Sequence, residues 1–144
     1  MVEIQVKTAR GGTMNSISWP IGTKAQGPSL HQREYFVMVA VPHDDSAAPR
    51  CFVLPRSHVA AAAWIEHMAW LTEPGIPEGK RNAPVDRSRV LLPTFAAYED
   101  RWDLLLIDEQ EAPVLLPPRF HELAQAAQVG LPPGHAWRTS MPDF

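Results

Sequence analysis

The stretch YFVMVAV, Tyr35–Val41, is a run of seven apolar residues between Glu34 and Pro42. A strand with apolar side chains on both faces suits the centre of a sheet that is covered on both sides. Pro42 has no backbone N–H with which to continue a ladder, so the strand is expected to end there. We therefore predict that Tyr35–Val41 is the central strand of the fold.

Two further strands are predicted, one on each side of this run in the sequence. CFVL, Cys51–Leu54, follows a polar turn and is expected to pair with the central strand as an antiparallel hairpin. VEIQVKT, Val2–Thr8, alternates apolar and polar residues, which is typical of a strand with one face of each kind. The intervening stretch, Ala9–Gln32, is rich in Gly, Ser, Thr and Pro and is expected to form a loop.

A helix is predicted after the hairpin. Ser57 is expected to cap its N-terminus, and the helix is expected over Val59–Leu71. Glu66 and His67 are expected to face solvent, while an apolar stripe packs on the sheet: Trp64, Ile65, Met68 and Leu71. The predicted fold class is therefore α/β (α+β), a small mixed β-sheet with one covering helix.

The remainder of the chain is predicted to be largely irregular. Pro74–Pro93 contains four basic residues and few apolar ones, which indicates an exposed basic loop. Thr94–Leu106 combines a helical turn with an apolar end, and Trp102 is expected to fill the core. A last helix is expected over Arg119–Val129, directly after two prolines.

Length and composition limit the organisation. The chain has 144 residues, enough for one sizeable core, and its 15 prolines are about twice the average usage. We expect one domain over residues 1–106 and a proline-rich C-terminal extension over residues 107–144. The single cysteine, Cys51, excludes an intrachain disulfide and indicates a reducing compartment. Because no apolar stretch approaches the roughly 20 residues that span a bilayer, we expect a cytoplasmic protein without a membrane partner.

The charges are unevenly distributed along the chain. A net charge of −3 gives no overall attraction to phosphate. Yet the first 33 residues carry one acidic side chain and four basic ones: Lys7, Arg10, Lys24 and Arg33. Between Tyr98 and Glu122 the balance reverses, with seven acidic and two basic residues. This basic set could follow a phosphate backbone, joined or not by Lys80, Arg81, Arg87 and Arg89, or it could form a solvated surface. Trp19 could stack on a base or pack its loop down.

The residues with catalytic potential lie on the polar face of Val2–Thr8. Glu3, Gln5 and Lys7 alternate along this face at intervals of about 7 Å. Metal-dependent phosphodiester hydrolysis needs oxygen ligands for Mg²⁺ and a cation close to the attacking water. An oxygen ligand and a lysine two residues apart meet that need, although the same pattern also occurs on solvated strands.

The order of motifs resembles that of a small bacterial group of PD-(D/E)XK nuclease-like proteins. The motifs that carry the resemblance are IQVKT (Ile4–Thr8), VLPRSHV (Val53–Val59) and RWDLL (Arg101–Leu105), with YFVMVAV and HMAWL between them. The resemblance covers about residues 2–105. It implies a partial restriction-endonuclease-like core followed by the C-terminal extension.

The resemblance also implies roles for individual residues. Gln5 matches the second acidic ligand, a position that some Mrr-like restriction enzymes fill with glutamine, and Lys7 matches the lysine of the motif. The Val6 carbonyl matches the usual backbone ligand, and Glu3 is a candidate for further negative charge. The implied metal ligands are thus Gln5, Val6 and Glu3 with Mg²⁺ as cofactor, the catalytic residues Lys7, Gln5 and Glu3, and the DNA-binding residues Lys7, Arg10, Lys24 and Arg33.

One departure from the family pattern leaves the function open. Members place a helix and a strand with an essential aspartate before the Q-x-K strand, whereas only Met1 precedes Val2 here. Three explanations are a mis-assigned start or an N-terminal truncation, a split nuclease completed by another chain, and a degenerate domain that keeps the fold for binding. We expect either a Mg²⁺-dependent endonuclease acting on DNA or a non-catalytic binding protein, for example one associated with bacterial immunity or defence. Without the family's first helix its docking face is exposed, so we expect a homodimer or a second chain to cover it, or the C-terminal helix Arg119–Val129 to fill the gap.

Overall fold

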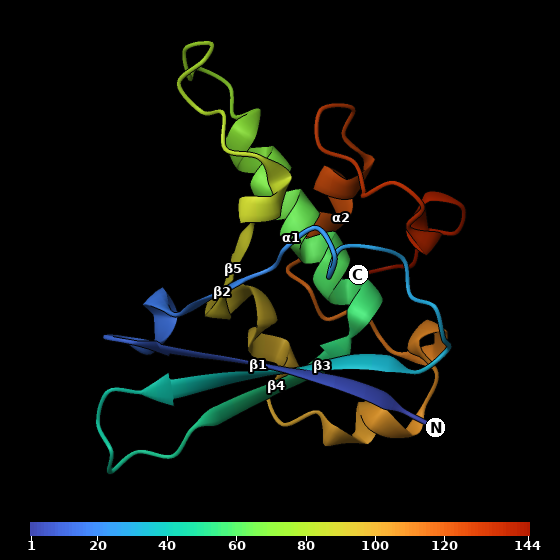
Figure 1. The fold of residues 1–144 in the computed structure, drawn as a ribbon. Helices are drawn as coiled ribbons and strands as arrows, with labels where there is room; N and C mark the ends of the chain where they lie inside the picture. Colours follow the sequence, from blue (N-terminus) through green and yellow to red (C-terminus); the bar gives the residue numbers. More distant parts are fainter.

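The computed structural model describes all residues, Met1–Phe144, and is built around a three-stranded sheet (Figure 1). The strand order is β1 (Glu3–Gly11), β3 (Glu34–Pro42) and β4 (Arg50–Pro55), with β1 parallel and β4 antiparallel to the central β3. The three predicted strands and the mixed α/β class are therefore confirmed.

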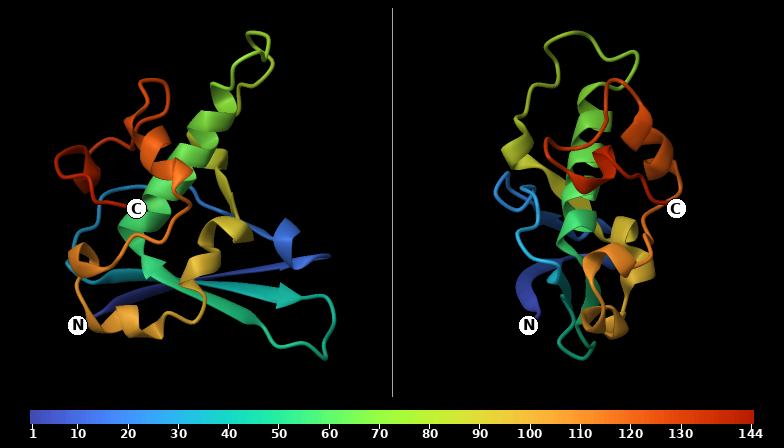
Figure 2. Two further views of the ribbon diagram at one scale, coloured as in Figure 1. Left: turned by 180° about the vertical axis from the view of Figure 1, so that it is seen from behind. Right: turned by 90° about the vertical axis from the view of Figure 1, so that its right-hand side faces the viewer.

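Both faces of β3 are covered, as its apolar sequence predicts. Phe36 and Met38 face the helix α1 (Arg56–Leu71), and the alternate residues Tyr35 and Val37 face the opposite side. Figures 1 and 2 show α1 across one face of the sheet and a short 3-10 helix, η4 (Trp102–Leu106), on the other. The sheet thus forms the middle of three layers.

The start of α1 differs from the prediction. The helix begins at Arg56, immediately after β4, and Pro55 rather than Ser57 occupies the capping position. The expected Ser57 cap is wrong, because Ser57 lies inside the first turn, where its own N–H needs an acceptor. A distant side chain supplies that acceptor: Glu109 Oε1 accepts a hydrogen bond of 2.9 Å from the Ser57 N–H.

The expected solvent exposure of Glu66 and His67 is also wrong. His67 is buried and its Nε2 donates to the Ala83 carbonyl over 2.8 Å, while the Thr94 hydroxyl donates to Glu66. Burial raises the pKa of Glu66. The reason is that α1 is covered on a second side, by the strand β5 (Arg89–Leu91) and its approach.

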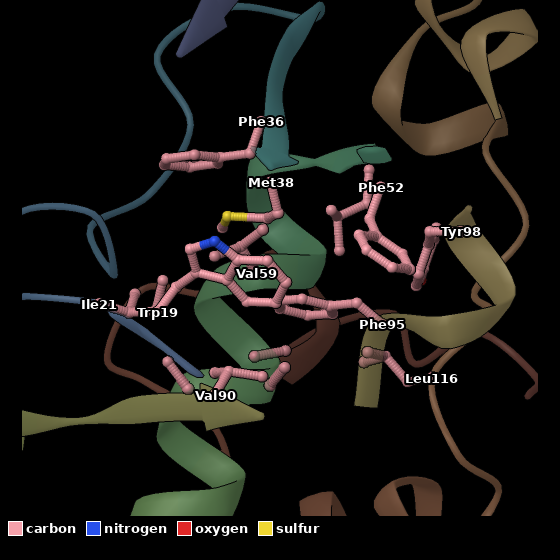
Figure 3. Packing of buried hydrophobic residues seen from close by; sticks show 14 of the residues in the cluster. Trp19, Ile21, Phe36, Met38, Phe52, Val59, Val90, Phe95, Tyr98 and Leu116 are labelled. Carbon is pink, nitrogen blue, oxygen red and sulfur yellow. The ribbon is translucent and has the colours of Figure 1, made fainter. Parts of the chain in front are cut away.

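A second, two-stranded sheet was not predicted. β2 (Ser18–Pro20) pairs antiparallel with β5, which places the fully buried Trp19 against α1 and the main sheet. Trp19 Nε1 donates to the Val39 carbonyl over 3.1 Å. Figure 3 shows its ring between Met38 and Val90. The base-stacking alternative for Trp19 is therefore wrong, and the packing alternative is confirmed.

The predicted role of Trp102 in the core is wrong. Its side chain is 46% exposed, whereas Leu104 of the same 3-10 helix is buried. Side chains in a 3-10 helix follow one another at about 120°, so only one of three neighbouring residues faces the sheet. The exposed loop predicted over Pro74–Pro93 is confirmed only in its first part, which projects from the molecule in Figure 1. Its last part is wrong, because Arg89–Leu91 form a strand and Ser88, Val90 and Leu92 are buried.

The C-terminal segment packs against α1 rather than on β1. Its helix α2 (Arg119–Gln125) is shorter than expected. Phe120, Leu131 and Trp137 belong to the same hydrophobic cluster of 29 buried residues as the sheet. Trp64 Nε1 of α1 also donates to a carbonyl of this segment over 2.8 Å. None of the helices combines the length and the apolar character that crossing a bilayer requires.

Candidate functional site at the open sheet edge and the adjacent pocket

β1 is paired on one side only, so its other edge is open. The Glu3 N–H donates to the Arg33 carbonyl over 2.9 Å, which fixes the direction of the backbone groups. Because successive residues of a strand point their N–H and C=O groups to alternate sides, the Val6 carbonyl faces the open edge. An unprotected strand edge of this kind can pair with another strand.

The structure brings the three predicted catalytic side chains onto one face of β1. The register places Gln5 beside Phe36 and Lys7 beside Met38. The side chains of Glu3, Gln5 and Lys7 therefore project from the same face of the sheet, the one that α1 covers. They lie at its rim: Glu3 and Gln5 are exposed and Lys7 is half-buried.

The row does not by itself form a magnesium site. Glu3 is its only carboxylate, and Glu3 Oε2 lies 3.8 Å from His31 Nε2. The Gln5 side chain projects perpendicular to the sheet, whereas the Val6 carbonyl lies in the plane of the sheet, so the two oxygens point in different directions. Nowhere in the structure do three His, Cys, Asp or Glu side chains come together as metal ligands. Mg²⁺ demands near-octahedral oxygen ligands, usually with carboxylates among them. Further anionic ligands are therefore needed before these residues fit the ion.

The predicted DNA-binding residues do not share one surface. The side chains of Lys7 and Arg10 project from opposite faces of β1, because they are three positions apart and side chains alternate along a strand. Lys24 is exposed in a turn. Arg33 is engaged within the fold, since its Nη2 donates to the Leu105 carbonyl and its Nε is buried. A molecule that contacts both Lys7 and Arg10 must therefore reach around the open edge.

A pocket of about 740 Å³ opens next to this edge. The loop Gly27–Gln32, the first turn of α1 and two C-terminal stretches around Glu109 and Trp137 line it. His31 connects the two places, because it pairs with Glu3 of β1 and also lines the pocket.

His58 is the most deeply buried polar residue of the pocket, with 1% of its surface exposed. Its Nδ1 lies 2.8 Å from the Tyr98 hydroxyl, which accepts a hydrogen bond of 2.9 Å from the Leu115 N–H. Burial, with a smaller contribution from His135, lowers the pKa of His58 to about 3. The imidazole is therefore neutral at physiological pH.

Glu109 and His135 bracket the first turn of α1. Glu109 accepts hydrogen bonds from the Ser57 N–H and, over 3.0 Å, from the Ser29 hydroxyl, and burial raises its pKa. His135 Nε2 donates to the Ser57 carbonyl over 2.7 Å, and burial lowers its pKa. The pocket is thus lined by one carboxyl group and three imidazoles, and those of His58 and His135 are neutral at pH 7.

Sequence reasoning missed the pocket for a physical reason. His58, Glu109 and His135 come from three distant segments, and no spacing in the sequence links them. The neighbouring pair Ser57 and His58 has no nucleophile-elbow motif, and the ring of His58 bonds to Tyr98 rather than to Ser57. The pocket is therefore not a hydrolase triad.

Comparison with known proteins gives no relative from which a role could be transferred: no protein-family model, curated protein or solved structure matches the chain.

Proposed function

We propose that β1 is the nucleic-acid-binding strand of a nuclease-like domain, in which Lys7 and Arg10 contact DNA phosphates around the open edge. The observation that carries this proposal is the position of both cations on a strand that is paired on one side only. Lysine and arginine contacts to phosphate provide most of the affinity in sequence-independent DNA binding. In this proposal the protein acts in the cytoplasm, as its single cysteine indicates.

The pairing of the cations supports this edge over the opposite one: Lys7 forms no ion pair and Arg10 Nη1 lies 3.9 Å from Asp45, whereas Arg50 of β4 is held by two hydrogen bonds of 2.8 Å to Glu99. Glu99 and Asp100 lie next to β4, at the other side of the sheet, where Glu99 bridges to Phe52. DNA at β1 therefore meets a lysine that is free of an ion pair. Of the two functions expected from the sequence, the non-catalytic one is favoured for the isolated chain, because Glu3 is the only carboxylate in the row.

Removing both cations from β1 is expected to weaken DNA binding about tenfold, because two phosphate contacts are lost. The variant is Lys7→Ala with Arg10→Ala, and the assay is fluorescence anisotropy with a labelled duplex at about 50 to 200 mM salt. The slope of log affinity against log salt is expected to fall by about 2, since each phosphate contact contributes about 0.9.

The matched control removes the same charge elsewhere. Lys80→Ala with Arg87→Ala alters two exposed cations beyond α1, and its affinity is expected to change by less than about twofold. Equal losses in the two double variants would mean that only net charge matters, and the proposal would then fail. Incubation with plasmid and Mg²⁺ or Mn²⁺ is expected to give no cleavage, whereas cleavage lost in Lys7→Ala would restore the catalytic interpretation.

The open edge also suits a homodimer or a second chain that pairs with β1. Val6 is 59% exposed on the outer face of this strand, and the backbone groups of Thr8 face the open side. Thr8→Pro removes an N–H from that side while leaving the bonds to β3 intact. Light scattering is expected to show concentration-dependent self-association of the wild-type chain and a monomeric Thr8→Pro. A wild-type monomer at all concentrations would leave only a different chain as partner.

A further inference from the structure

The pocket beside the first turn of α1 has the size of a small-molecule site. Its volume of about 740 Å³ lies within the range of about 300 to 1,000 Å³ that is typical of ligand pockets. Leu30, Val114 and Trp137 supply apolar surface, while nine of the 19 lining residues have polar side chains. Such a combination lets shape give affinity while the polar groups select the ligand.

His58 presents a hydrogen-bond donor to this pocket. The Tyr98 hydroxyl already accepts a hydrogen bond from the Leu115 N–H, so we assign its own O–H as the donor to His58 Nδ1. If Nδ1 were the donor instead, the buried hydroxyl proton would have no acceptor. The neutral ring then carries its proton on Nε2. Nε2 has no hydrogen-bond partner within the protein. Only two side-chain polar atoms without a partner are completely buried, Gln26 Oε1 and Arg33 Nε, so Nε2 keeps some exposed surface. Nε2 therefore reaches the pocket that His58 lines.

Glu109 presents a hydrogen-bond acceptor to the same pocket. Only 7% of the residue is exposed, and the bonds from Ser29 and from the Ser57 N–H both end on Oε1. Oε2 receives neither of them. Oε1 thus holds the helix, the Ser57 side chain is a further hydrogen-bonding neighbour of the carboxylate, and Oε2 is the oxygen that we assign to a ligand N–H.

We propose that this pocket binds a small planar molecule in which a carbonyl or ring-nitrogen acceptor lies beside an N–H donor, as in a nucleobase or a primary carboxamide. The ligand's acceptor accepts a hydrogen bond from His58 Nε2–H, and the ligand's N–H donates to Glu109 Oε2. The ligand's ring packs on the apolar surface that includes Trp137. The proposal does not depend on DNA binding at β1, because the ligand carries no phosphate.

Calorimetric titration of the full chain with free small molecules tests the proposal. The probes are nicotinamide and the four ribonucleosides, with benzoate as a planar ring that has no N–H and carries a negative charge. We expect at least one N–H probe to bind with a Kd below about 1 mM and benzoate to bind at least about tenfold more weakly. Nicotinamide alone would identify a carboxamide site and nucleosides alone a nucleobase site. No binding of any N–H probe below about 10 mM would overturn the proposal.

Glu109→Gln sharpens the test because the amide is isosteric with the carboxylate. Its oxygen must stay on the Ser57 N–H and the Ser29 hydroxyl, so its NH₂ group takes the place of Oε2 and meets the donor of the ligand. We expect at least a tenfold loss of affinity. Glu111→Gln, which changes an exposed neighbour outside the pocket, is expected to bind as the wild type does.

A measurement on the wild-type protein removes the dependence on correct folding of the variant. Nitrogen-15 spectra of the histidine side chains are expected to show His58 protonated at Nε2 and to show a shift of that nitrogen on ligand addition. Equal affinity of wild type and a folded Glu109→Gln, or a His58 Nε2 signal that ligand leaves unchanged, would refute the assignment.

Discussion

Between pH 7 and about pH 4, the free energy of unfolding is expected to fall by about 3 kcal/mol because of His58 alone. In the folded protein burial lowers the pKa of His58 from its ordinary value of 6.5 to about 3. A depressed pKa contributes stability that is complete above the unfolded value and is lost as pH falls towards the folded one. Below pH 6.5 this histidine binds a proton in the unfolded chain but not in the folded chain. The free energy of unfolding therefore falls by about 1.4 kcal/mol per pH unit.

Other buried groups modify this profile in known directions. Burial also lowers the pKa of His135, which adds to the loss in the same window. Burial raises the pKa values of Glu66 and Glu109, so their protonation in the folded state offsets part of the loss near the acidic end. The isolated contribution of His58 must therefore be obtained by difference.

Urea denaturation of wild type and His58→Asn across this pH range supplies the difference. The asparagine amide oxygen can still accept from the Tyr98 hydroxyl, but it does not titrate. We expect the variant to be less stable at pH 7 and to lose about 3 kcal/mol less on acidification. His43→Asn, in an exposed turn, is the matched control and is expected to retain the wild-type slope. Parallel profiles for wild type and His58→Asn would contradict the buried neutral imidazole.

The features that could be predicted from the sequence are those that local pattern determines. The apolar run Tyr35–Val41 and its short partner Cys51–Leu54 are strands because their residues and the flanking prolines favour that state wherever they pack. The alternation in Val2–Thr8 likewise places Glu3, Gln5 and Lys7 on one face. The continuous apolar run also predicts the central place of Tyr35–Val41, whereas the alternation in Val2–Thr8 does not show that this strand lies at an edge.

The features that could not be predicted depend on contacts between distant segments. β2 and β5 have three residues each, and about 70 positions separate them, so neither carries a periodicity of its own. The burial of Glu66 and His67 follows from the second layer over α1, and the wrong assignment of Ser57 as a cap follows from the acceptor that Glu109 supplies. Pairing at long range thus decides both the helix start and the pocket.

The sheet edge and the pocket are mechanically connected. Buried Glu34 at the start of β3 accepts a hydrogen bond of 3.0 Å from the His31 N–H, and its other oxygen lies 3.7 Å from Arg56 Nη1 at the start of α1. The loop that lines the pocket is therefore held by the strand next to β1.

The C-terminal segment is expected to be indispensable to the stability of the sheet. Phe120 of α2 is almost completely buried within the same hydrophobic cluster as β3 and β4. Tyr98 also packs in that cluster, and its hydroxyl accepts a hydrogen bond from the Leu115 N–H of the C-terminal segment. A division into a domain over residues 1–106 and an independent extension predicts instead that a lesion in α2 leaves the sheet intact.

Phe120→Ala distinguishes these alternatives. We expect it to lower the free energy of unfolding by about 3 to 5 kcal/mol, a large part of the 5 to 15 kcal/mol that typically holds a domain together. Leu106→Ala removes an apolar side chain that is 79% exposed and is expected to change stability by less than about 0.5 kcal/mol. Urea unfolding followed by tryptophan fluorescence and by circular dichroism should give one shared transition, displaced in Phe120→Ala. If only an early, separate transition moves while the sheet unfolds as in the wild type, residues 107–144 form a unit of their own.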